Sequence, residues 1–146
     1  DLHSFPTRRS SDLDLNNIRE GKGSIYYKNG DIFQGDFTMG KQTGKGVYIF
    51  NDGEKYEGEF NNGIMEGNGI YHFNNGDRYE GEFKNGKKEG QGKIFYDNGD
   101  RYEGEFKNDV KDGKGKLYLA NGEVIDKIFV NDKQVEESDN NQNLID

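Results

Sequence analysis

The chain has 146 residues, enough for one domain, and only 29% of them are hydrophobic. An ordinary globular domain has roughly 45–50%, so a conventional two-layer core is not expected. The formal net charge of −8 argues against nucleic acid as a partner, because phosphate binding needs clustered Lys and Arg. The absence of cysteine excludes disulfides and thiolate chemistry and fits an intracellular location.

The first thirteen residues, DLHSFPTRRSSDL, share no pattern with the rest of the chain. They resemble the in-frame translation of a short-read sequencing adapter, and a disordered basic arm is the alternative. We therefore treat residues 1–20 as a non-native or disordered leader and expect the natural sequence to begin near Asp14, part-way through a longer protein. Arg8 and Arg9 are accordingly not interpreted as a targeting or lipid-binding pair.

A repeat organises the remainder. The stretch NGDRYEGEFKN occurs unchanged at residues 75–85 and 98–108, which sets a period of 98 − 75 = 23 residues. Four full repeats run from Asp31 to Gly122, with a half repeat before them (Gly21–Gly30) and a degenerate half after them (Glu123–Val130). A fixed period in this range indicates a repeat architecture, and the regular placement of 22 glycines and 19 aromatic side chains (10 Phe plus 9 Tyr) argues against disorder.

Each repeat is predicted to form two strands. In DRYEGEF (residues 100–106), aromatic residues or glycine alternate with charged residues, which is the period of two typical of a strand, and GQGKIFY (Gly90–Tyr96) is the second strand. We predict that a three-residue loop, residues 97–99, joins such strands, because a type I turn closed by a left-handed glycine explains the place of Gly99.

This loop length sorts the side chains into two faces, since a slip of one residue would exchange them. On the predicted apolar face the opposite pairs are Ile25–Phe33, Tyr48–Tyr56, Tyr71–Tyr79, Ile94–Tyr102 and Leu117–Ile125. On the other face they are Lys22–Asp36, Lys45–Glu59, Lys93–Glu103 and Lys116–Asp126. Glycine pairs between the aromatic residues let rings lie against the backbone. The predicted fold is all-β: an elongated, single-layer antiparallel meander of 23-residue β-hairpin repeats.

The segment YEGEFKNGKKEGQGKIFYDNG (residues 79–99) resembles the MORN repeat, whose pattern is Y-x-G-x-F-x-x-G-x-x-x-G-x-G with a 23-residue period. The resemblance covers Gly21 to about Val130 and implies a MORN-type solenoid. Departures lie at the ends: Phe33 replaces the first Tyr, Asp109 stands where other repeats have Gly, and the last half unit has Ile125 in place of Tyr, which suggests a terminal cap.

The resemblance implies a function without catalysis. MORN repeats are associated with scaffolding, with protein–protein contact and, in some members, with membranes that contain phosphoinositides. In relatives such as plant phosphatidylinositol phosphate kinases the repeats accompany another domain. We therefore expect a scaffold that binds a protein partner; a membrane-targeting module and the accessory region of a truncated enzyme are the alternatives.

Two sets of candidate site residues follow. The first is an aromatic face that could hold a partner peptide or helix, and its rings are expected to cover the sheet while remaining partly exposed: Tyr48, Tyr56, Phe60, Tyr71, Tyr79, Phe83, Tyr102 and Phe106. The second is a set of lysines beside the hairpin turns that could contact anionic headgroups, against the simpler interpretation of solvated loops: Lys84, Lys87, Lys88, Lys107 and Lys111.

No constellation for chemistry is found in the sequence. Carboxylate pairs such as Glu80 and Glu82 recur in every unit opposite lysines, whereas a catalytic pair is normally unique and lies in a cleft. His72 has no companion ligand, so no metal and no cofactor is expected. We expect a cytoplasmic protein, associated with the cytoskeleton or a membrane, with a disordered acidic tail over residues 131–146, and we leave a homodimer open.

Overall fold

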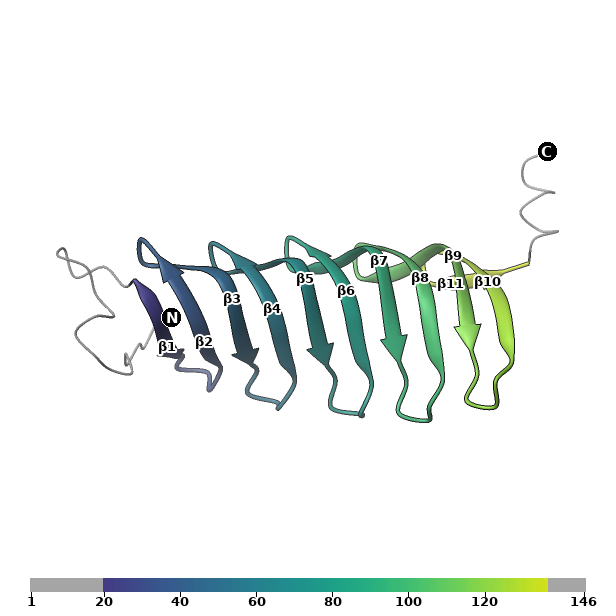
Figure 1. The fold of residues 1–146 in the computed structure, drawn as a ribbon, viewed down its shortest axis with the longest axis horizontal. Helices are drawn as coiled ribbons and strands as arrows, with labels where there is room; N and C mark the ends of the chain where they lie inside the picture. The colour runs from purple at the N-terminus through teal and green to yellow at the C-terminus, as the bar shows by residue number, and fades with distance from the viewer. Residues whose placement is uncertain (1–19, 137–146) are drawn as a thin grey trace.

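The computed structural model describes residues 20–136, which form one antiparallel sheet of eleven strands in sequence order. Figure 1 shows the strands side by side along the long axis, with no second layer over the sheet. The all-β, single-layer prediction is therefore confirmed. The strands are β1 (Gly21–Tyr26), β2 (Ile32–Thr38), β3 (Lys41–Ile49), β4 (Lys55–Asn61), β5 (Ile64–His72), β6 (Arg78–Lys84), β7 (Lys87–Phe95), β8 (Arg101–Lys107), β9 (Val110–Tyr118), β10 (Val124–Val130) and β11 (Lys133–Val135).

The loop between β7 and β8 has the predicted three residues. The Gly99 N–H donates to the Tyr96 carbonyl at 3.0 Å, and the Tyr96 N–H donates to the Asp100 carbonyl at 2.9 Å, which closes the loop over residues 97–99. Gly99 has a φ of 97°, the left-handed conformation that favours glycine. The same hydrogen bonds recur 23 residues apart in the other long loops, which all lie on one edge of the sheet (Figure 1).

The predicted register is confirmed at all five junctions between repeats, and with it the separation of an aromatic face from a charged face. A row of directly paired glycines crosses the sheet from β1 to β9 and ends where Gly115 pairs with Lys127 of β10. Its members are Gly23, Gly35, Gly46, Gly58, Gly69, Gly81, Gly92, Gly104 and Gly115.

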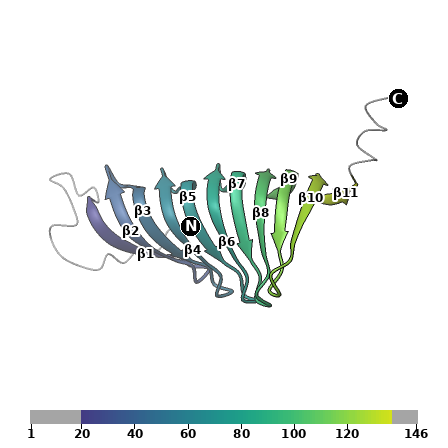
Figure 2. The same cartoon turned by 45° about the vertical axis from the view of Figure 1, so that its right-hand side comes forward.

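A β-bulge within each repeat was not predicted. The pairing of β6 with β7 shifts between Gly81 and Phe83, and Gly90 adopts a φ of 73° there. The Glu82 carboxylate accepts the Gln91 N–H at 3.1 Å and so fixes the irregular backbone. Because bulges bend and twist a strand, their recurrence in each repeat accounts for the curved strands of Figure 2.

The core is a ladder of aromatic rings, of which every second ring lies on the glycine row. A Cβ added at Gly92 would lie 2.4 Å from the Tyr79 ring, so only glycine leaves room for the ring against the backbone. Successive rings meet edge to face at centroid distances from 5.0 Å to 5.9 Å, the arrangement that aromatic quadrupoles favour. In spatial order the ladder is Phe37, Phe33, Phe60, Tyr56, Phe83, Tyr79, Phe106, Tyr102 and Phe129.

The ends of the sheet differ from the expected boundaries. Lys133–Val135 forms β11 against β10, so the sheet continues past residue 130 into the predicted acidic tail. At the other end the Glu20 carboxylate, in the predicted leader, accepts the Met39 N–H at 2.6 Å. The interpretation of residues 1–13 as a translated adapter, and the rest of the predicted tail, fall on residues 1–19 and 137–146, outside the described residues.

Candidate functional site

Six of the eight predicted aromatic-face residues are core residues. Tyr56 and Tyr79 are 0% exposed, Tyr102 is 1% exposed, and the three phenylalanines at 60, 83 and 106 are 4–5% exposed. Our expectation that these rings remain partly exposed was wrong. The three tyrosines lie against the glycine backbone, and all six rings are packed between rings of their own and a neighbouring repeat. These six rings support the aromatic face from within the core and have almost no exposed surface that a partner could contact.

The other two predicted residues, Tyr48 and Tyr71, belong to a second row of half-buried rings on the same face, which we call the outer row. From Tyr27 to Phe73, successive rings are tilted against one another at centroid distances from 4.7 Å to 5.8 Å. Four members were not predicted from the sequence, although Phe50, Phe73 and Tyr96 stand 23 residues apart just before the long loops. The outer row consists of Tyr27, Tyr48, Phe50, Tyr71, Phe73 and Tyr96.

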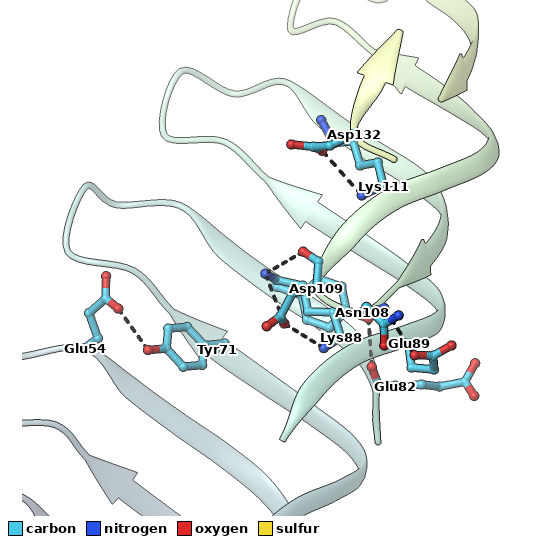
Figure 3. Close-up of polar contacts among 10 residues, drawn as sticks. Glu54, Tyr71, Glu82, Lys88, Glu89, Asn108, Asp109, Lys111 and Asp132 are labelled. Carbon is cyan, nitrogen blue, oxygen red and sulfur yellow. Dashed lines mark hydrogen bonds and ion pairs between the residues drawn. The ribbon is translucent and has the colours of Figure 1, made fainter. Parts of the chain in front are cut away.

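Carboxylates at the starts of the even-numbered strands hold the outer row in place. The Tyr71 hydroxyl donates to the Glu54 carboxylate at 2.9 Å (Figure 3), and the Tyr48 hydroxyl donates to Asp31 at 2.7 Å. Burial, and then the adjacent carboxylate, raise the pKa of both tyrosines above the usual value. Asp31 and Glu54 also accept N–H groups from the next loop, at Asn51 and Asn74, so these acids are occupied within the fold.

The five predicted lysines fall into two groups. Lys84, Lys87 and Lys107 are exposed beside the two-residue turns, as predicted. Lys88 and Lys111 instead lie over aromatic rings: the Lys88 ammonium is 5.4 Å from the Phe73 centroid, and the Lys88 side chain is only 16% exposed. The five lysines therefore do not form one exposed row that could contact lipid headgroups together.

Two grooves lie between the ladder and the outer row, and their equivalent lining residues, such as Phe50 and Tyr96, are two repeats apart (96 − 50 = 46). The first, of about 360 Å³, is lined by Phe50, Met65, Tyr71 and Phe73, with Lys88 at its margin. The second groove has a volume of about 410 Å³. It is lined by Tyr96, Lys111, Leu117, Lys127 and Phe129, and by Asn98 and Asp100 at the loop between β7 and β8.

Comparison with known families agrees with this geometry. Five consecutive copies of the MORN repeat are matched, at residues 15–32, 33–55, 56–78, 79–101 and 102–124. The chain belongs to the MORN repeat family. The last four matched copies begin at ladder aromatics, so the units that we counted as four full repeats and partial ends are divided at another point of the period. The MORN repeat is a non-catalytic repeat domain.

No match is found among curated proteins. Among solved structures, the chain is similar to the SAS-4 (dCPAP) TCP domain of Drosophila melanogaster, solved in complex with a proline-rich motif of Ana2 (dSTIL). The identity is 14% and the TM-score 0.42, over 80% of this chain and 76% of that one.

The opposite face of the MORN sheet is a surface of short-range ion pairs. Arg78 pairs with Glu80 at 2.6 Å and stacks on the Phe95 ring at 3.9 Å, and Arg101 repeats this arrangement on Tyr118 and Glu103. The expected cross-strand partner of Glu103, Lys93, lies opposite it in the register, but the arginine on Glu103's own strand forms the ion pair. These carboxylates are therefore engaged with neighbouring cations.

Residues 20–136 contain no group of three or more His, Cys, Asp or Glu side chains placed to bind a metal ion. The same part of the chain has no helix with the length and apolar character to cross a membrane. His72 contacts Glu57 at 2.8 Å, and this hydrogen bond, followed by the charge of Lys55, lowers the pKa of the Glu57 carboxyl.

Proposed function

We propose that this MORN domain is a non-catalytic scaffold that binds an extended segment of a protein partner along its outer row. The observation that carries the proposal is the row itself: Tyr48, Phe50, Tyr71 and Phe73 form a continuous, half-buried apolar surface that no other element of residues 20–136 covers. A contiguous apolar surface on a soluble protein is typical of an interaction site.

The spacing of the grooves supports an extended segment. Neighbouring strands lie roughly 4.8 Å apart, so two grooves that are two repeats, or four strands, apart are separated by about 19 Å. An extended chain advances about 3.3 Å per residue, so side chains about six residues apart reach the two grooves. The rigid ladder beneath keeps the grooves in place, which lowers the ordering cost of binding.

The test is selection of a phage-displayed library of random peptides on the full chain. Peptides selected on the native chain are expected to lose binding to a Tyr71→Ser, Phe73→Ser variant. The matched control is Phe95→Ser, Tyr118→Ser, which removes two half-buried rings from the opposite face.

The folded content of both variants is checked by circular dichroism and urea unfolding. Selected peptides that bind the Tyr71→Ser, Phe73→Ser variant as well as the native chain, or that lose binding only to the control, would show that the outer row is not the docking surface.

A further inference from the structure

Lys88 and Lys111 occupy the same position in successive repeats (111 − 88 = 23), but their ammonium groups are neutralised differently. The Lys88 Nζ lies 3.9 Å from the Asp109 carboxylate and donates to the Asp109 carbonyl at 3.5 Å (Figure 3). Asp132 is the counterpart of Asp109 one repeat later, yet its carboxylate accepts the Lys111 backbone N–H at 3.4 Å and makes no ion pair with the ammonium.

The Lys111 ammonium is held among rings instead. Its Nζ donates to the Tyr96 hydroxyl at 2.8 Å and lies 4.8 Å from the Tyr102 centroid and 4.9 Å from the Phe129 centroid. Within residues 20–136 it forms no ion pair with a carboxylate. Ring faces attract a cation but supply no negatively charged hydrogen-bond acceptor. One of the three N–H donors of Lys111 is used by the Tyr96 hydroxyl, so the other two are available to an anion.

A second cation lines the same groove. The Lys127 Nζ donates to the Gln134 side chain at 3.1 Å and, in the part of the chain that the structure describes, has no ion pair either. The one carboxylate in the groove, Asp100, is already occupied, since it accepts the Ala120 N–H at 2.9 Å and the Asn98 side-chain amide at 3.3 Å. The groove therefore combines an apolar wall with two cations that no described carboxylate neutralises.

We propose that this second groove is a carboxylate subsite of the aromatic face, in which Lys111 and Lys127 bind an Asp or Glu side chain of the partner segment. The inference rests on the proposed function and adds a sequence preference to it. The first groove, where Lys88 is neutralised by Asp109, takes an apolar side chain. Because the grooves are two repeats apart, the partner carries its acidic residue about six positions from its apolar anchor.

The repeat itself supplies a matched pair of variants. Met65 occupies the position of Lys88 and Lys111 in an earlier repeat and packs against the core, so methionine fits this place in the fold. Lys111→Met removes the unpaired cation, and Lys88→Met removes the one that Asp109 already neutralises.

The probes are the heptapeptides acetyl-Leu-Ala-Ala-Ala-Ala-Ala-Glu-amide and acetyl-Leu-Ala-Ala-Ala-Ala-Ala-Gln-amide, titrated into the full chain and followed by NMR shifts of Tyr96, Lys111 and Leu117. We expect the Glu peptide to bind about tenfold more tightly than the Gln peptide, because a hydrogen bond to a charged group is the stronger kind. This preference is expected to vanish in Lys111→Met and to persist in Lys88→Met.

Equal affinity for both peptides, or equal loss of the preference in both variants, would overturn the subsite. If peptides from the random library still depend on Tyr71 and Phe73 in that case, the docking function stands and only the carboxylate assignment fails. Binding to phosphatidylcholine–phosphatidylserine vesicles that Lys111→Met abolishes, with no preference for the Glu peptide, would assign the two lysines to lipid headgroups and also overturn the proposal.

Discussion

The ladder and the outer row are built from the same residue types on the same face, yet one is core and the other is surface. A ladder ring such as Tyr79 lies on paired glycines and is fully buried, whereas the neighbouring Tyr71 is half-buried and tilts against Phe73. The difference lies beneath the ring, where a missing Cβ lets it sink against the backbone. In this single-layer sheet the glycine row thus buries every second ladder ring, and the phenylalanines between them, such as Phe83, are buried by edge-to-face contacts with those rings.

The largest expected effect separates the two rows by stability. Phe83→Ala removes a buried ring that contacts both Tyr56 and Tyr79 and should cost about 3–5 kcal/mol in the free energy of unfolding. Phe73→Ala removes a half-buried ring and should cost only about 1 kcal/mol. Urea unfolding measures both, and equal losses would show that the rows share the core role.

The next effect tests the glycine row directly. Gly92→Ala places a methyl group 2.4 Å from the Tyr79 ring, so overpacking should cost about 1–3 kcal/mol, although alanine usually suits a strand better than glycine. Combining it with Tyr79→Ala should make the alanine at 92 neutral or stabilising. A cost that persists after the ring has been removed would place the strain elsewhere than in the ring–glycine contact.

The parts of this structure that depend on pairing within the sheet could be predicted from the sequence. The alternation of side chains between the two faces of a strand, together with the loop length, was enough to place Tyr71 opposite Tyr79 and Gly92 opposite Gly104. The family could also be inferred from the spacing of glycine and aromatic residues, since each has a fixed place in the 23-residue unit.

The bulge and the burial of the rings could not be predicted in this way. The bulge depends on a contact between the Glu82 carboxylate and the Gln91 backbone, and strict alternation contains no such irregularity. Ring burial depends on contacts between repeats, such as Tyr56 with Phe83, which no pairing rule for adjacent strands includes. The aromatic residues could therefore be assigned to a face, but not divided into core and surface.

A smaller effect compares two ladder tyrosines. The Tyr79 hydroxyl donates to the Glu82 carbonyl at 2.9 Å, whereas the buried Tyr102 hydroxyl has no hydrogen-bond partner within residues 20–136. Burial, and then the charge of Glu105, raise the pKa of Tyr102 to about 12. Tyr79→Phe should cost about 1 kcal/mol, while Tyr102→Phe should be neutral or slightly stabilising, as Phe33 at the same position in an earlier repeat suggests. Equal losses in urea unfolding would mean that Tyr102 has a partner in solution.

The smallest expected effect lies on the charged face and depends on pH. The hydrogen bond from His72, and then Lys55, lower the pKa of Glu57 in the folded chain, so this carboxylate contributes stability above its unfolded pKa and loses it as pH falls through the lower, folded pKa. Because both partners are well exposed, Glu57→Gln should cost no more than about 0.5 kcal/mol at neutral pH.

That difference should vanish once the carboxyl is protonated in both states, at a pH well below its lowered, folded pKa. Urea unfolding of the native chain and Glu57→Gln at neutral and acid pH measures it. A difference that stays constant with pH would mean that the glutamine perturbs packing, and a difference much larger than this would give the charged face a share of the stability that we assign to the ladder.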